Sequence, residues 1–205
     1  MKNLDKELLL WLNNWGSESI DFFWVFLTDK FIAIPFFGIL ILLIWYKSNF
    51  KTAFVVGVFL LALVGFTDLF ATLIKNWVER PRPCSVHSNL TDQVRVVRDG
   101  LFSSLTKSNA EKCEKFSFFS SHAAVSFALA VFLGRLLQKL RKAALLWMLL
   151  WAFLVSVSRI YLGFHYPSDI FVGGVVGMVF GFIAFEIYQL VIKNYLSKFA
   201  FKPNK

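Results

Sequence analysis

Long apolar runs separated by short polar turns dominate this chain, and their lengths indicate helices that cross a membrane. Five runs are predicted to span the bilayer, at about residues 31–46, 52–74, 120–138, 143–160 and 170–192. The first is short and carries Pro35 near its start, so we expect its outer end to continue back through the preceding apolar piece. The pattern predicts an all-α, polytopic membrane helical bundle.

The segment before the first span is predicted to form short interfacial helices over residues 1–30. Residues 4–15 are typical of an amphipathic helix that is too short to cross the bilayer, and residues 19–28 form a second short apolar piece. If residues 8–28 do cross, the number of spans rises from five to six. We expect a single membrane domain over residues 1–205, because no internal repeat or composition break divides the chain.

Composition and charge agree with a multi-pass membrane protein. Hydrophobic residues make up 57% of the chain, and the formal net charge is +9. The basic residues gather in short turns and the C-terminal tail: Lys47, Lys51, Arg135, Lys139, Arg141, Lys142, Lys193, Lys198, Lys202 and Lys205. The positive-inside rule places these in the cytoplasm and the other end of the bundle in the periplasm or outside the cell. No nucleic-acid-binding motif accompanies the charge, so we expect no nucleic-acid partner.

One long polar loop, residues 76–117, falls on that outer side and holds both cysteines, Cys84 and Cys113. In an oxidising compartment we expect a disulfide between them, and the alternative is a pair of free thiols. Their spacing fits no common zinc motif.

The segment over residues 158–169, SRIYLGFHYPSD, carries the strongest chemical signal. It places Arg159, His165 and Asp169 at one membrane edge, where ionisable side chains are costly and usually functional. Asp169 follows His165 by four residues, a spacing that lets a carboxylate hold one imidazole nitrogen and leave the other free.

Two other segments complete a pattern. They are KNWVERPRP, beginning at Lys75, and FSSH, ending at His122. Together the three resemble the signature of the type 2 phosphatidic acid phosphatase superfamily: Lys-x6-Arg-Pro, Pro-Ser-Gly-His and Ser-Arg-x5-His-x3-Asp. The first and third parts match at every defined position, whereas Phe119 replaces Pro and Ser121 replaces Gly in the second. The resemblance covers roughly residues 52–190.

The residues themselves suit phosphate chemistry. Lys75, Arg82 and Arg159 are cations at one end of the predicted bundle, and arginine can grip phosphate oxygens with its fork. Ser120 and Ser121 begin a predicted span, and a helix N-terminus with free N–H groups is a natural anion site.

The resemblance implies the roles. His165 would be the nucleophile that forms a phosphohistidine, Asp169 would orient its ring, and His122 would act first as general acid and then as base. The phosphate would bind to Lys75, Arg82, Ser120, Ser121 and Arg159. The resemblance implies no metal and no other cofactor.

The leading hypothesis is a multi-pass lipid phosphatase of a bacterial cytoplasmic (inner) membrane, with its site facing outward. Its substrate would enter sideways from the bilayer. The family implies undecaprenyl pyrophosphate, which is our first expectation, phosphatidic acid, phosphatidylglycerol phosphate or lipid A phosphate. One alternative is a lipid phosphotransferase with the same intermediate. Another is a non-catalytic membrane protein that binds or transports phospholipids.

Three further polar residues are interpreted more conservatively. Arg80 is expected to contact a headgroup or the loop, His87 to lie on the surface, and Asp68 to support the site or pack between helices. A stripe of small residues in the last span is expected to pack inside the bundle: Gly173, Gly177 and Gly181.

Overall fold

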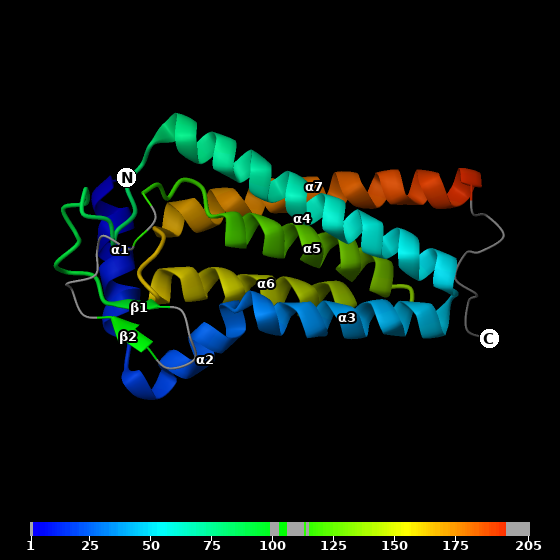
Figure 1. Ribbon diagram of the computed structural model, residues 1–205, viewed down its shortest axis with the longest axis horizontal. Coiled ribbons are helices and arrows are strands. Elements are labelled where there is room, and N and C mark those ends of the chain that lie inside the picture. The colour runs from blue at the N-terminus through cyan, green and yellow to red at the C-terminus, as the bar shows by residue number, and fades with distance from the viewer. Residues whose placement is uncertain (1, 99–102, 106–112, 114, 196–205) are drawn as a thin grey trace.

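The computed structural model describes residues 2–98, 103–105, 113 and 115–195, which form seven α-helices and one two-stranded antiparallel hairpin (Figure 1). The elements are α1 (Lys2–Asn14), α2 (Glu18–Thr28), α3 (Lys30–Lys47), α4 (Phe50–Val78), β1 (Val96–Arg98), β2 (Ser103–Leu105), α5 (Ser121–Leu137), α6 (Ala144–Tyr161) and α7 (Pro167–Tyr195). The helical fold class predicted from the sequence is confirmed.

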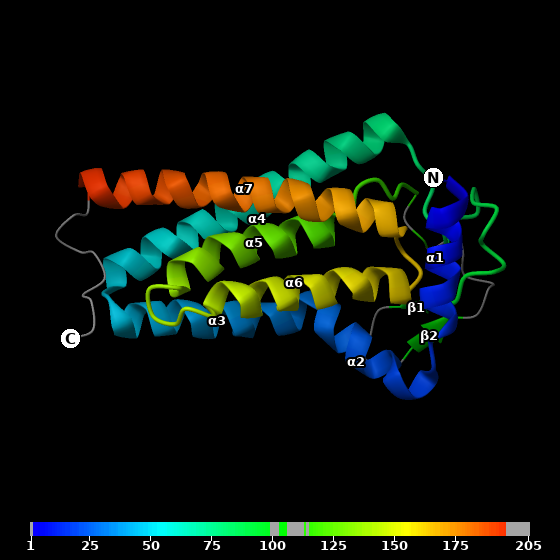
Figure 2. The ribbon, with the colours of Figure 1, turned by 180° about the vertical axis from the view of Figure 1, so that it is seen from behind.

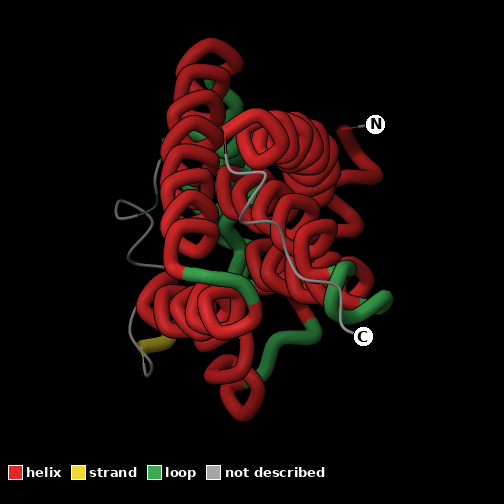
Figure 3. The backbone as a smooth tube through the Cα atoms, turned by 90° about the vertical axis from the view of Figure 1, so that its right-hand side faces the viewer, coloured by secondary structure: helices red, strands yellow, loops and turns green. Residues whose placement is uncertain are grey.

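Helices α3 to α7 run along the long axis, and α1 lies across one end of them together with the hairpin (Figures 1 and 2). Helix α2 leads from α1 into α3, and the two helices are bent by 48° at the break between them. Helix α4 starts beside α3 and diverges from it toward Val78, so it appears inclined when the bundle is viewed along its axis (Figure 3).

Helix α5 forms the centre of the bundle and packs on α4, α6 and α7. Its small side chains allow close approach to α7, where a Cβ at Gly177 would lie 2.1 Å from the Ala124 carbonyl oxygen and one at Gly181 2.3 Å from that of Ala128. The glycine stripe therefore packs inside the bundle, as the sequence predicted.

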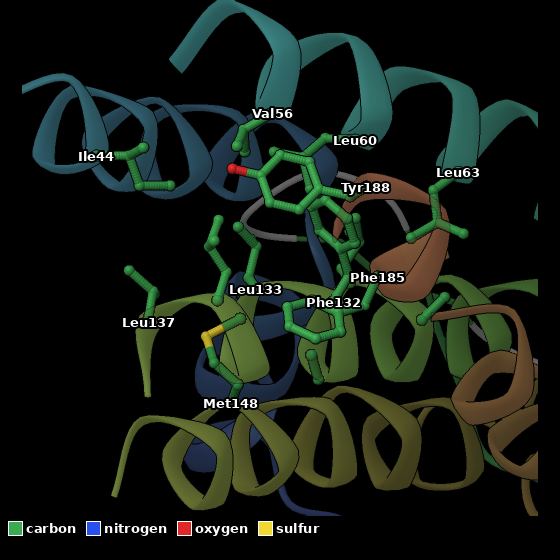
Figure 4. Packing of buried hydrophobic residues seen from close by; sticks show 14 of the residues in the cluster. Ile44, Val56, Leu60, Leu63, Phe132, Leu133, Leu137, Met148, Phe185 and Tyr188 are labelled. Atoms are coloured by element: carbon green, nitrogen blue, oxygen red, sulfur yellow. The ribbon is translucent and has the colours of Figure 1, made fainter. Parts of the chain in front are cut away.

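The largest apolar core lies around the middle of α5, away from the α1 end. The ring of Phe132 stacks on Phe59 at 5.9 Å between centroids and meets the edge of Tyr188 at 5.7 Å. Figure 4 shows Leu133 and Met148 close to this group. Because Phe132 is fully buried, it ties α5 to α4 and α7.

The five-span prediction is supported only in part. Three helices, α4, α6 and α7, are long and apolar enough to cross a membrane, and the bent pair of α2 and α3 passes the same test as one unit. Helix α5 has 17 residues, a length of about 25 Å, which falls short of a 30 Å hydrocarbon core. Helix α4 also extends beyond the predicted end at residue 74, so Lys75 lies within the helix.

The N-terminal helices are fixed to one end of the bundle by polar contacts that the sequence did not predict. The Asn13 amide donates hydrogen bonds of 2.8 Å to the carbonyls of Arg95 and Tyr161, and Arg95 pairs with Asp21. The disulfide expected from the sequence is also present and joins Cys84 and Cys113, which lie 29 positions apart in the loop. These contacts hold the segment around residues 81–98 against the ends of α1, α2 and α6.

Candidate active site

The turn between α6 and α7 places His165. Helix α6 ends at Tyr161, and the backbone N–H groups of Phe164 and His165 both donate to the Arg159 carbonyl, at 3.0 and 3.2 Å. Gly163 has φ +80°, and a Cβ there would lie 2.7 Å from the Arg95 carbonyl oxygen, so this tight turn requires glycine. The turn directs the buried His165 side chain into the protein.

Asp169, in the first turn of α7, contacts the His165 ring. Oδ2 of Asp169 lies 3.5 Å from Nδ1 of His165, and both side chains are buried. This distance is longer than a hydrogen bond, and such catalytic contacts often tighten only when substrate binds. The pairing directs Nδ1 toward the carboxylate and leaves Nε2 as the nitrogen available for chemistry.

The start of α5 brings the second motif to the same place. Ser120 precedes the helix, its Oγ accepts from the Ala123 N–H at 3.4 Å, and its own N–H donates 3.1 Å to the Asp169 carbonyl. Lys75 of α4 donates a 2.9 Å hydrogen bond from Nζ to Oγ of Ser121. His122 follows in the first turn with its side chain exposed.

Two buried guanidinium groups complete the arrangement. Nε of Arg82 donates to the Phe116 carbonyl at 3.1 Å, and Nη1 of Arg159 donates to Oγ1 of Thr28 at 3.3 Å. Both lie over the ring of Phe164, at 5.9 Å and 4.6 Å from its centroid. Sharing one aromatic ring holds the two like charges on the same side of the site.

Burial and charge keep His165 neutral. Desolvation is the largest cause that lowers the pKa of His165 well below its ordinary value, followed by repulsion from Arg82, Arg159 and Lys75. The same three cations and His165 also act electrostatically on His122. The structure therefore gathers both imidazoles and the three cations into one cup. We call it the phosphate cup, after the ligand that the sequence resemblance implies: Lys75, Arg82, Ser120, Ser121, His122, Arg159 and His165.

Two expectations from the sequence are wrong in detail. Arg80 does not simply contact the loop, because Nη1 of its guanidinium donates a 2.7 Å hydrogen bond to Oδ1 of Asp169. Asp68 is exposed on α4 rather than packed between helices, because it lies on the face of α4 that points away from the bundle, whereas Thr67 and Ala71 on the inner face are buried. His87 is exposed, as predicted.

Sequence reasoning also missed Asp5 and Thr28, which reach site residues from the N-terminal helices. No local motif marks either residue. Among the described residues, no group of three or more His, Cys, Asp or Glu side chains is placed to hold a metal ion.

Comparison with known proteins identifies similar sequences over most of the chain. The sequence profile of the PAP2 superfamily matches residues 56–193. A lipid A 4'-phosphatase from Bacteroides thetaiotaomicron is 30% identical over 188 residues, which cover 91% of this chain and 78% of that protein. Another from Porphyromonas gingivalis is 28% identical over 197 residues, covering 94% of this chain and 76% of that protein.

Two solved structures share the fold. The crystal structure of Aquifex aeolicus LpxE superposes with a TM-score of 0.63 at 22% identity, covering 89% of this chain and 95% of that one. The PAP2-type phosphatidylglycerolphosphate phosphatase from Bacillus subtilis gives a TM-score of 0.65 at 20% identity, covering 95% of this chain and 88% of that one.

Proposed function

Because this chain belongs to the PAP2 superfamily and is a multi-pass membrane lipid phosphatase, we propose that it removes a phosphate from a lipid A-type glycolipid through a phosphohistidine at His165. The observation that supports this chemistry most is the phosphate cup, with one buried imidazole whose Nδ1 faces Asp169 and whose Nε2 is left for attack. The two lipid A 4'-phosphatases among its relatives favour lipid A over undecaprenyl pyrophosphate.

In the first step, Nε2 of His165 attacks phosphorus in line with the bond to the lipid oxygen. The nitrogen–phosphorus bond forms, the phosphorus–oxygen bond to the lipid breaks, and His122 gives a proton to the departing lipid alcohol. Lys75, Arg82 and Arg159 neutralise the charge on the three remaining phosphate oxygens, aided by the N–H groups at the start of α5.

In the second step, His122 takes a proton from a water molecule that attacks the phosphohistidine. The nitrogen–phosphorus bond breaks, inorganic phosphate is released, and neutral His165 is regenerated. Asp169 stabilises the positive charge that His165 carries while phosphorylated. The cations of the cup supply the charge neutralisation, so we propose that hydrolysis proceeds without a metal ion.

The site is proposed to face the periplasm of a bacterial inner membrane. Lys47, Arg135 and Lys193 lie at the ends of α3, α5 and α7 that are remote from the phosphate cup. The positive-inside rule would place these ends in the cytoplasm. A lipid of the outer leaflet could then present its phosphate to the cup from the bilayer.

The test is phosphate release by the purified protein in detergent containing a chelator. The panel comprises lipid A, undecaprenyl pyrophosphate, phosphatidic acid and phosphatidylglycerol phosphate, with mass spectrometry to locate the phosphate that lipid A loses. We expect release from lipid A to be fastest. Phosphate transferred to an added acceptor lipid would instead support the phosphotransferase, and binding without any turnover would support the phospholipid-binding alternative.

A further inference from the structure

The carboxylate of Asp169 is held by an arginine that the reaction scheme does not use. Nη1 of Arg80 donates to Oδ1 of Asp169 at 2.7 Å, and Nη2 donates to Oδ2 of Asp5 at 2.6 Å. The guanidinium carbon lies 3.8 Å from the centroid of the Tyr166 ring. One arginine fork thus bridges α1 and α7, and the tyrosine ring fixes its position.

Asp5 also caps the N-terminus of α7 from another helix. Its Oδ1 accepts from the Ser168 N–H at 2.9 Å and its Oδ2 from the Ser168 hydroxyl at 2.6 Å. Asp169 in turn accepts from the Tyr166 N–H at 3.0 Å, which is the reciprocal half of a capping box. Asp5 therefore replaces the cap side chain that Tyr166, the residue before α7, does not provide.

The charges of the network suit an orienting carboxylate. Arg80 alone would offset the negative charge that Asp169 needs in order to stabilise a positive His165. Asp5 shares the Arg80 guanidinium, so the three side chains of Asp5, Arg80 and Asp169 together carry one net negative charge. The network therefore fixes the orientation of the Asp169 carboxylate and still leaves one net negative charge beside His165.

The network lies outside the phosphate cup. Asp5, Arg80, Tyr166 and Ser168 line a separate cleft of about 880 Å³ between α1, the end of α4 and the start of α7. None of the residues of the phosphate cup lines this cleft. A substrate phosphate in the cup would therefore not touch Asp5 or Arg80.

We propose that Asp5 and Arg80 are positioning residues that orient the Asp169–His165 pair, which makes helix α1 part of the catalytic apparatus. The proposal rests on the proposed function, in which His165 is the nucleophile. The predicted effect is on kcat rather than on substrate binding, because a small displacement of a reacting group is enough to slow the reaction of a bound substrate.

The experiment compares Arg80→Gln, Arg80→Lys and Asp5→Asn in the full-length protein, with Lys6→Gln as the matched control. Lys6 lies on the same helix and lines the same cleft, but it is not in the network. For Arg80→Gln and Asp5→Asn we expect kcat to fall by about 10- to 100-fold with KM changed less than about threefold. Arg80→Lys should recover part of kcat, and Lys6→Gln should match the wild type.

The pH dependence of kcat separates this role from a structural one, because its position does not depend on the fraction of active protein. His165 is faced by Lys75 of α4, Arg82 of the loop, His122 of α5, Arg159 of α6 and Asp169 of α7, with Arg80 and Asp5 beyond Asp169. The acid limb of the profile is the part in which kcat falls as His165 becomes protonated. Asp5→Asn removes a negative charge and should move this limb to lower pH. Arg80→Gln removes a positive charge and should move it to higher pH.

Unchanged kcat in both variants, or acid limbs that move in the same direction, would overturn the positioning role. A wild-type protein that releases no phosphate from any lipid would instead overturn the proposed function, so the two failures are distinguishable. The double variant provides a further check, because coupled residues should give a combined loss smaller than the product of the single losses.

Discussion

Lys75 and Ser121 lie 46 residues apart in the chain, yet Nζ of Lys75 donates a 2.9 Å hydrogen bond to Oγ of Ser121. Ser121 is one of the two positions at which the second motif departs from the signature of the family. The hydroxyl supplies an acceptor that glycine lacks, and it holds the ammonium group of α4 beside the first turn of α5. The departure thus adds a contact within the phosphate cup.

Ser121→Ala removes this acceptor and keeps the backbone N–H. We expect KM for the lipid phosphate to rise by about 10- to 100-fold, because a hydrogen bond to a charged group stabilises by roughly 1.5–3 kcal/mol. Initial rates as a function of lipid concentration measure the change. Ser156→Ala, whose hydroxyl bonds only within α6 to the Ala152 carbonyl, is the control. An unchanged KM in Ser121→Ala would contradict the role of this bond.

Removing each of the two imidazoles of the cup should affect turnover to a different extent. His165→Ala should abolish phosphate release and the acid-labile phosphoprotein, because no nucleophile remains. His122→Ala should slow turnover by about 10²- to 10⁴-fold, the usual contribution of a general acid–base group. His87→Ala, at an exposed position of the loop, is the control and should retain wild-type turnover. Rapid-quench experiments with radiolabelled lipid phosphate measure both species.

Acid should destabilise the fold through His165. Burial, with repulsion from Arg82, Arg159 and Lys75, lowers the pKa of His165 below its unfolded value of about 6.5, so the unfolded chain binds the proton more readily. Its contribution to stability is complete above about pH 6.5 and is lost as the pH falls toward the folded pKa. Melting temperatures from pH 4.5 to 7.5 should decline less steeply in His165→Gln than in wild type. Equal slopes would show that this histidine is not the group responsible.

Removing the Cys84–Cys113 disulfide should destabilise the loop between α4 and α5. For a bond that closes a loop of 29 residues, the chain-entropy relation gives a loss of about 3–4 kcal/mol on replacing both cysteines by serine. The melting temperature of the double variant under oxidising conditions tests this, with reduced wild type for comparison. The prediction fails if wild-type stability does not respond to reductant while its cysteines become reactive to thiol reagents.

One glycine of the stripe in α7 and one glycine of α4 give a matched pair of substitutions. A Cβ at Gly177 would lie 2.1 Å from the Ala124 carbonyl oxygen, whereas one at Gly65 of α4 would meet nothing within 4 Å. Gly177→Ala should destabilise the bundle by about 1–3 kcal/mol through overpacking. Gly65→Ala should be neutral or stabilise by up to about 1 kcal/mol. Thermal unfolding in detergent ranks the two, and similar melting temperatures would contradict close packing at Gly177.

The family and the helical fold class were predictable because both depend on local sequence. Motifs such as Lys75-x6-Arg82 and His165-x3-Asp169 keep their spacing along the chain. The ends of the predicted spans also indicated that these residues would gather at one end of the bundle. The structure places the three cations and the two imidazoles there, while their roles in catalysis remain predictions.

The partners of individual side chains were not predictable from the sequence. Arg80 lies between Lys75 and Arg82 without a family role, and Asp5 belongs to an amphipathic helix that looked suited only to the membrane interface. Asp68 lies inside a predicted span, but it falls on the face of α4 that points away from the bundle and is exposed. Each outcome depends on how helices cross, which no single periodicity encodes.

The sequence by itself determined the helices, the membrane class and the chemical groups, because apolar run length and motif spacing act over about one helix at a time. Only the tertiary structure decided which groups meet. The contact of Arg80 with Asp5 joins residues 75 positions apart, and that of Arg159 with Thr28 joins residues 131 positions apart. Contacts of this kind require α1 and α2 to lie over the end of the bundle that carries the site.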